Sequence, residues 1–94
     1  MKTIFKYPLR PDDYQIVIMP RGAQILTVQA QRERPCLWAL VETDNEPEER
    51  HFRMAGTGHL FTSKDKLLRY IGTFQVKAGE LVFHVFEIEG ARNE

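Results

Sequence analysis

Apolar and polar residues alternate along most of the chain, which is the pattern of β-strands that have one face in water. Turn-forming residues separate the alternating segments, such as Pro20 and Gly22 between the second and the third. The segments that we predict to be strands are 3–9, 14–20, 24–33, 35–42, 50–55 and the two halves of 70–89 around a turn at Gly79. This spacing predicts about seven strands.

The phase of the alternation predicts which side chains face the core. In the third segment, Leu26, Val28 and Ala30 are expected to point inward. Residues 35–42 and 81–88 are apolar at nearly every position, which predicts central strands that are buried on both faces.

Two connecting segments carry signals of their own. "TDNEPEE" (43–49) is charged and contains a proline, so it is expected to form an exposed hairpin loop. In "TSKDKLLRYI" (62–71), Thr62 or Ser63 is placed to cap a single helical turn.

These elements predict a mainly β fold, an antiparallel sandwich or small barrel of about seven strands with one short helical turn. No segment has the composition of a linker, so residues 1–94 are predicted to form a single domain. We expect an ordered core over about 3–89 and a tail at 90–94. A chain of this length removes only roughly 60–65% of its unfolded surface from water, so the core is expected to be small.

Composition and charge narrow the possible functions. Thirteen basic and thirteen acidic residues cancel, which argues against a surface built to hold extended nucleic acid. The single cysteine, Cys36, excludes an internal disulfide and is expected to be a buried thiol. No apolar run reaches the ~18 residues that cross a bilayer, and charge and proline interrupt the N-terminal segment. A cytoplasmic protein without a membrane partner is therefore expected.

The stretch "AGTGH" (55–59) is the main candidate for chemistry. It lacks the third glycine and the helix of a dinucleotide fingerprint, and it lacks the Gly-Lys-Ser/Thr triplet of a Walker loop. The first interpretation is a turn or bulge at Gly56 and Gly58. The second is a nest of backbone N–H groups that binds an anion, to which Thr57 adds a hydroxyl and His59 a donor.

Catalytic and metal sites find little support in the sequence. The histidines His51, His59 and His84 have no spacing typical of a metal site, so no metal and no cofactor are predicted. The acidic residues cluster near a loop that would hold them loosely, and no nucleophile motif is present. No catalytic residue is assigned. If a pocket exists, His84 is the polar side chain best placed to line it.

Arginine outnumbers lysine, and a guanidinium recognises phosphate or carboxylate through paired hydrogen bonds. Arg53 lies just before the glycine stretch, and Trp38 offers a ring on which a base could stack. The other interpretation of these arginines is a solvated surface with weak ion pairs. The predicted ligand-binding residues are Trp38, Arg53, Gly56, Thr57, Gly58, His59 and His84.

The words "RGAQILTVQAQ", "PCLWALVE", "FRMAGTGH", "YIGTFQ" and "LVFHVFE" resemble, in order and spacing, a family of small uncharacterised β-domain proteins encoded by bacteriophages and prophages. The resemblance runs from about Tyr7 to Ile88. It implies an accessory protein of a phage or prophage, and it brings no catalytic residues. Some other small phage proteins neutralise host defence, and by analogy this chain is expected to act in that way.

Three functions remain open at this point. The first is non-catalytic binding of a small phosphorylated, nucleotide-like ligand. This site is predicted at a subunit boundary, because so small a domain has little room for an internal pocket. That hypothesis includes a homo-oligomer. The second is a protein-interaction domain that binds a host or phage protein through an exposed patch or an open sheet edge. The third is a hydrolase that acts on a nucleotide signal.

Overall fold

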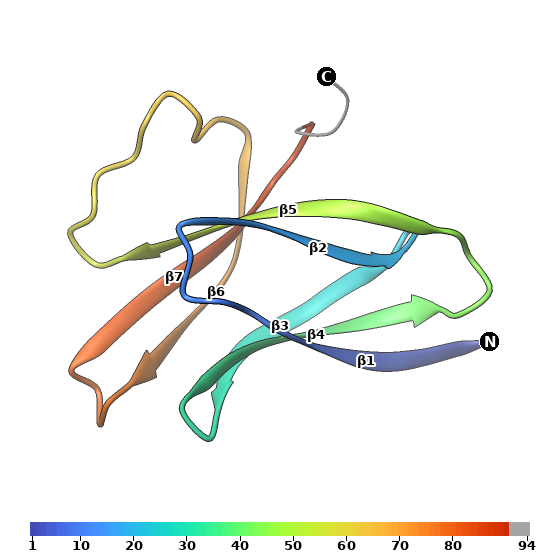
Figure 1. Ribbon diagram of the computed structural model, residues 1–94, viewed down its shortest axis with the longest axis horizontal. Helices are drawn as coiled ribbons and strands as arrows, with labels where there is room; N and C mark the ends of the chain where they lie inside the picture. The colour runs from blue at the N-terminus through green and yellow to red at the C-terminus, as the bar shows by residue number, and fades with distance from the viewer. Residues whose placement is uncertain (91–94) are drawn as a thin grey trace.

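Two antiparallel sheets built from seven strands face one another in the computed structural model, which describes residues 1–90 (Figure 1). The first sheet has the strand order β1-β4-β3 and the second has the order β2-β5-β7-β6. The strands are β1 (Lys2–Pro8), β2 (Tyr14–Pro20), β3 (Gln24–Gln31), β4 (Arg34–Glu42), β5 (Pro47–Gly56), β6 (Leu68–Val76) and β7 (Leu81–Ile88). The predicted all-β sandwich is thus confirmed, and the sheets do not close into a barrel.

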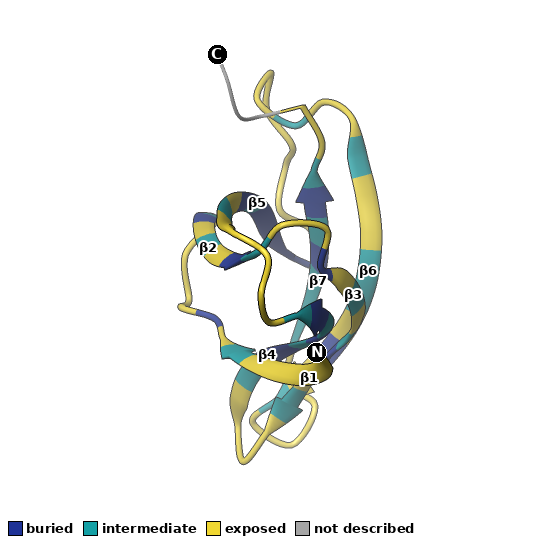
Figure 2. Cartoon of the chain, turned by 90° about the vertical axis from the view of Figure 1, so that its right-hand side faces the viewer, coloured by how far each residue is buried: buried dark blue, intermediate teal, exposed yellow. Residues whose placement is uncertain are grey.

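The core lies between the two sheets, where the buried stretches of the central strands gather (Figure 2). Residues on alternate positions of each central strand reach it, as expected for sheets that each bury one face. Its most deeply buried large side chains are Met19, Leu37, Val41, Phe52 and Val85. Cys36 is also buried, as predicted, and carries a free thiol.

β4 and β7 are central in their sheets, which confirms part of the expectation for residues 35–42 and 81–88. Burial on both faces was wrong for these strands. Leu37, Ala39 and Val41 are buried on the inner face of β4, and only Val85 and Glu87 are buried on the inner face of β7. Trp38 on β4 and His84 on β7 lie on half-buried outer faces.

Two other local predictions, for Leu26 and for residues 43–49, were also wrong. The pairing of β3 with β4 skips Leu26, so a β-bulge reverses the phase there. Leu26 is consequently 44% exposed and Ile25 packs against the core in its place. Residues 43–49 form no hairpin, because β4 and β5 belong to different sheets.

The predicted helical turn near Thr62 is a β-turn, and residues 1–90 contain no helix. The backbone N–H of Asp65 donates to the Thr62 carbonyl at 2.9 Å, and the Thr62 N–H donates to the Asp65 carboxylate at 2.6 Å. These two bonds close the turn and leave no continuing helical ladder. Of the predicted tail, residues 91–94 lie outside the described part of the chain, and Gly90 follows β7 in a turn.

The two sheets come closest where β3 and β6 meet along their edges. A Cβ atom added to Gly72 would lie 2.9 Å from Cγ1 of Val28, so only glycine fits at this position. Gly72 follows a β-bulge in β6. Because Gly72 has no side chain, the backbone of β6 can lie directly against Val28 of β3.

We therefore expect Gly72→Ala to lower the free energy of unfolding by about 1–3 kcal/mol, through overpacking against Val28. Urea denaturation measures this change. In a Val28→Ala background the same substitution should cost much less, since the clashing methyl group is gone. An equal cost in both backgrounds would show that the close contact is not the cause.

Candidate functional site

A row of large side chains crosses the outer face of the four-stranded sheet, which is the face turned away from the core. Tyr14 of β2 pairs with Arg53 of β5, which pairs in turn with Phe86 of β7. Tyr70 of β6 completes the row, with its ring centroid 5.6 Å from that of Phe86. The ring centroid of Phe61 lies 5.8 Å from that of Phe86, in an edge-to-face arrangement. The Arg53 guanidinium lies 4.8 Å from the Tyr14 ring and 5.3 Å from the Phe61 ring.

Arg53 tethers the connection between β5 and β6, residues 57–67, to this face. Its Nε donates to Asp65 Oδ1 at 3.0 Å and its Nη2 donates to the Leu60 carbonyl at 3.2 Å. Nη1 donates to the Met54 carbonyl at 3.0 Å. The Arg53 side chain is only 3% exposed, so its nitrogens serve the protein's own acceptors. Sequence reasoning placed Arg53 near the site but missed Asp65 as its partner.

Asp65 receives several hydrogen bonds at once. The Tyr14 hydroxyl donates to Oδ1 at 2.8 Å, and the Thr62 amide donates to Oδ2. Burial alone would raise the pKa of Asp65. The bonds from Thr62 and Tyr14, together with the charge and hydrogen bond of Arg53, outweigh burial and hold the pKa of Asp65 below its ordinary value.

The "AGTGH" stretch forms the turn that the sequence first suggested. Gly58 has φ of 91°, a conformation that favours glycine. The Gly56 N–H donates to His59 Nδ1 at 3.1 Å and the His59 N–H donates to the Gly56 carbonyl at 3.0 Å. The Thr57 N–H donates to the Val82 carbonyl at 3.1 Å. Three of the amides that an anion nest would need are therefore already bound.

Polar side chains next to this turn also bind one another. The Thr57 hydroxyl lies 2.8 Å from His84 Nε2, and the Thr73 hydroxyl lies 2.9 Å from His84 Nδ1. Tyr70 Oη continues the chain to Thr73 at 2.6 Å. The hollow beside the turn has a volume of only about 200 Å³, and Glu80 lines it. A carboxylate at this place disfavours an anionic guest.

Trp38 lies apart from the other predicted site residues. Its neighbours Leu37 and Ala39 are fully buried in the core, so Trp38 points outward from the three-stranded sheet, on the opposite side of the sandwich. Within one copy of the chain, Trp38 cannot stack on a ligand held at "AGTGH". The structure gathers Arg53, the glycine turn and His84 on one face and leaves Trp38 on the other.

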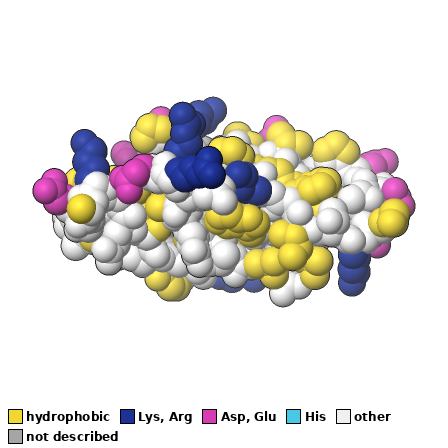
Figure 3. Space-filling model, turned by 90° about the horizontal axis from the view of Figure 1, so that it is seen from below, with side chains coloured by type: hydrophobic (Ala, Val, Ile, Leu, Met, Phe, Trp, Pro, Cys, Tyr) yellow, Lys and Arg dark blue, Asp and Glu magenta, His cyan; other side chains and the backbone are white. Residues whose placement is uncertain are grey.

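The outer face of the four-stranded sheet exposes several large apolar side chains. Ile16 and Ile18 of β2 are 48% and 52% exposed, Phe61 is 52% exposed and Tyr70 is 57% exposed. Exposed hydrophobic side chains also occur on the surface seen from below, where Lys and Arg side chains stand beside them (Figure 3). Contiguous exposed apolar surface commonly marks a site of interaction.

A hollow of about 350 Å³ lies on this face between β2 and the 57–67 connection. Tyr14, Ile16 and Ile88 give it an apolar lining, and Lys64 stands at one side. His51 Nε2 is buried there without a hydrogen-bond partner among the described residues, and the Glu49 carboxylate lies 3.9 Å from it. The hollow can accept an apolar side chain, and Lys64 is the charged group beside it.

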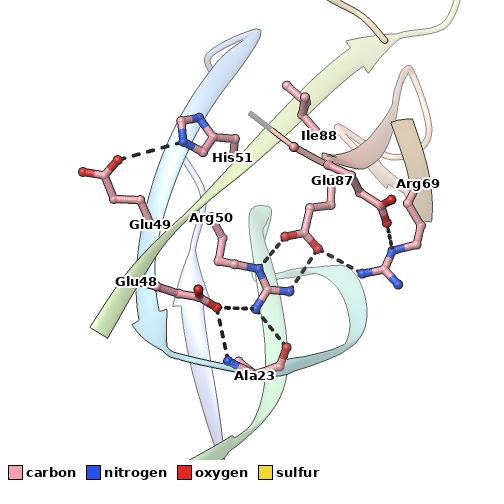
Figure 4. A pocket seen from close by; sticks show the side chains of 11 residues that line it. Ala23, Glu48, Glu49, Arg50, His51, Arg69, Glu87 and Ile88 are labelled. Carbon is pink, nitrogen blue, oxygen red and sulfur yellow. Dashed lines mark hydrogen bonds and ion pairs between the residues drawn. The ribbon is translucent and has the colours of Figure 1, made fainter. Parts of the chain in front are cut away.

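A second buried guanidinium lies on the inner side of the same sheet, where Arg50 of β5 meets Glu87 of β7 (Figure 4). Arg50 Nη2 donates to Glu87 Oε1 at 3.0 Å, and Arg50 Nε makes a second bond to the same carboxylate. Nη1 donates to the Ala23 carbonyl at 2.9 Å. The hydrogen bond to Glu87 raises the pKa of Arg50 despite burial. Sequence analysis missed this pair, although Arg50 sits in phase with core residues.

The groove beside this pair has a volume of about 370 Å³ and carries both signs of charge. Arg69 Nη2 donates to Glu87 at 3.4 Å, and Arg69 Nε lies 2.9 Å from Glu89. Glu48 accepts from the Gly22 N–H at 3.1 Å. These charged groups pair with one another, as Figure 4 shows. A charged ligand in the groove would therefore have to displace existing ion pairs and hydrogen bonds.

The whole chain, residues 1–94, matches a family described as a domain of unknown function, DUF7352. The chain belongs to this family. No curated protein and no solved structure matches it. Across residues 1–90 there is no helix long and apolar enough to span a bilayer, and no cluster of three or more potential metal ligands.

The tether between Arg53 and Asp65 predicts a specific dependence of stability on pH. Because the folded pKa of Asp65 lies below the unfolded value of about 3.9, its stabilisation is present above that pH and is lost as pH falls through the folded pKa. Asp65→Asn should cost about 1.5–3 kcal/mol at pH 7. Denaturant titrations from neutral to acid pH should show the gap to wild type closing below about pH 4. A gap that stays constant would mean that the charge of Asp65 contributes nothing.

The buried pair of Arg50 and Glu87 predicts a second stability effect. Arg50→Ala should lower the free energy of unfolding by about 3–5 kcal/mol, because Glu87 is left buried with only the longer contact to Arg69. The double variant R50M/E87L should recover most of that loss, since an apolar pair of similar volume carries no charge to desolvate. Urea denaturation of the two variants measures the difference. If the double variant is no more stable than Arg50→Ala, uncompensated charge is not the cause.

Proposed function

We propose that this domain binds a protein partner through the outer face of its four-stranded sheet. The observation that carries the proposal is the exposure of Ile16, Ile18, Phe61 and Tyr70 on one face whose buried cation, Arg53, is internally paired. Apolar contact area, rather than charge, is then what this face offers. Aromatic side chains such as Tyr70 and Phe61 are typical anchors of protein interfaces.

The shape of the face supports a protein partner rather than a small molecule. Its hollow of about 350 Å³ is partly open to solvent and is bordered by Ile16 and Lys64. An apolar side chain of a partner fits such a hollow, and a carboxylate or amide carbonyl beside that side chain can reach Lys64. The partner is therefore expected to present an apolar anchor next to a polar acceptor.

Binding of a small phosphorylated ligand at "AGTGH" has less support. Arg53 donates to Asp65 and to backbone carbonyls, and the amides of Gly56, Thr57 and His59 donate within the protein. An anion would have to displace these bonds. Under the resemblance to phage-encoded domains, the protein partner is a host or phage protein met in the cytoplasm, and blocking it is one way to counter host defence.

The test compares two exposed apolar side chains on opposite sides of the sandwich. Tyr70 of β6 is 57% exposed on the proposed face, and Ile4 of β1 is 55% exposed on the outer side of the other sheet. Proteins recovered by affinity capture with the wild-type domain are identified, and each is produced in pure form. We expect Tyr70→Asp to weaken binding of the true partner at least about tenfold, which is 1.4 kcal/mol. Ile4→Asp should leave binding within about twofold.

Equal binding by the wild type and Tyr70→Asp would contradict the proposal. A thermal-shift screen with phosphate and common nucleotides forms the other arm of the test. A saturable shift that Arg53→Lys abolishes would favour the small-ligand hypothesis, because a ligand at 100 times its dissociation constant adds about 2.7 kcal/mol.

A further inference from the structure

β2 forms one edge of the four-stranded sheet, and its free side carries unused backbone groups. Two backbone hydrogen bonds fix the phase of its pairing with β5: the Met54 N–H donates to the Asp13 carbonyl at 2.9 Å, and the Arg21 N–H donates to the Glu46 carbonyl at 2.7 Å. In an antiparallel pair, bonded and non-bonded residues alternate. Odd-numbered residues of β2 thus face β5, and the N–H and C=O groups of Ile16 and Ile18 point to the free edge.

The other sheet edges are protected in ways that β2 is not. β1 carries Lys2 and Lys6 and ends at Pro8, and such residues discourage strand addition. β3 and β6 lie against each other along their edges, as the contact at Gly72 shows. β2 has no charged residue and only Pro20 at its end. Figure 2 shows β2 at the margin of the molecule, with no strand beyond it. An uncharged, exposed edge strand favours pairing with another strand.

We propose that β2 pairs antiparallel with β2 of a second copy of this chain, with the two-fold axis at Val17. A two-fold axis makes the interface self-complementary, since each copy contributes the same strand. In this register Ile16 of each copy lies opposite Ile18 of the other. The outward N–H and C=O groups of these residues then bond to each other across the axis.

The charges that flank β2 favour this orientation. Asp13 precedes the strand and is 71% exposed at its side chain, and Arg21 follows the strand and is 65% exposed. Centring the pair on Val17 places Asp13 of one copy opposite Arg21 of the other, twice in the dimer. A parallel arrangement would instead bring like charges together. The uncharged middle of β2 adds no charge repulsion to either arrangement. The flanking charges of Asp13 and Arg21 therefore favour the antiparallel one.

The dimer would join two four-stranded sheets into one sheet of eight strands. Ile16 and Ile18 of both copies lie on its outer face and cover each other across the axis. The inference goes beyond the proposed function, because it concerns pairing along the free edge of β2, although Ile16 and Ile18 belong to both surfaces. Tyr70 lies on β6, the opposite edge strand, so Tyr70→Asp does not alter the dimer interface.

The first test is the mass of the full chain in solution, by sedimentation over roughly 5–500 µM, because a dimer responds to concentration. Wild type should approach twice its monomer mass of 11.0 kDa. I16K and I18E, each made alone, should raise the dissociation constant at least about tenfold, since each puts a charge beside an isoleucine. The double variant I16K/I18E should return to within about threefold of wild type, because the new charges face each other. A monomeric wild type, or a double variant weaker than both single ones, would overturn the proposal.

The second test reports the register directly. In a Cys36→Ala background, Val17→Cys places two thiols opposite each other at the axis, and mild oxidation should form a disulfide between copies. Ile16→Cys in the same background faces Ile18 and should cross-link much more slowly. Faster cross-linking through position 16 than through position 17 would overturn the register.

Discussion

β5 carries two buried guanidinium groups that point to opposite faces of the sheet, and the architecture on both sides depends on how they are neutralised. Arg50 points inward to Glu87, whereas Arg53 points outward to Asp65. Each pair joins β5 to a segment distant in sequence. A buried cation that lost its carboxylate would be costly, so these two pairs fix where β7 and the 57–67 connection must lie.

Because its cation is used internally, the outer face presents mainly apolar side chains. The connection that Arg53 holds down brings Phe61 onto Phe86, beside Tyr70. The ion pair of Arg53 with Asp65 thus helps to place apolar side chains on this face. A second copy along β2 would cover Ile16 and Ile18, which also belong to the partner face, and would leave Phe61 and Tyr70 exposed for a partner protein.

Local sequence pattern was enough to find the strands, because alternation reports one buried face regardless of which strand is the neighbour. It could not assign strands to sheets, so residues 43–49 were wrongly expected to form a hairpin. It missed the bulge at Leu26: Val28 and Ala30 face the core as predicted, but before the bulge Ile25 faces it in place of Leu26. The glycine turn was predicted correctly from Gly56 and Gly58. The distant partner Asp65 was not, because no local rule links residues twelve positions apart across a turn.

The central claim is that Arg53 is an internal tether and not a ligand-binding group. The most direct measurement is the side-chain Nε–H resonance of Arg53 in the NMR spectrum, followed as inorganic phosphate is added. We expect the resonance to exchange slowly with water and to keep its chemical shift throughout, because the Asp65 carboxylate accepts this proton. Rapid exchange with a saturable shift on phosphate addition would contradict it.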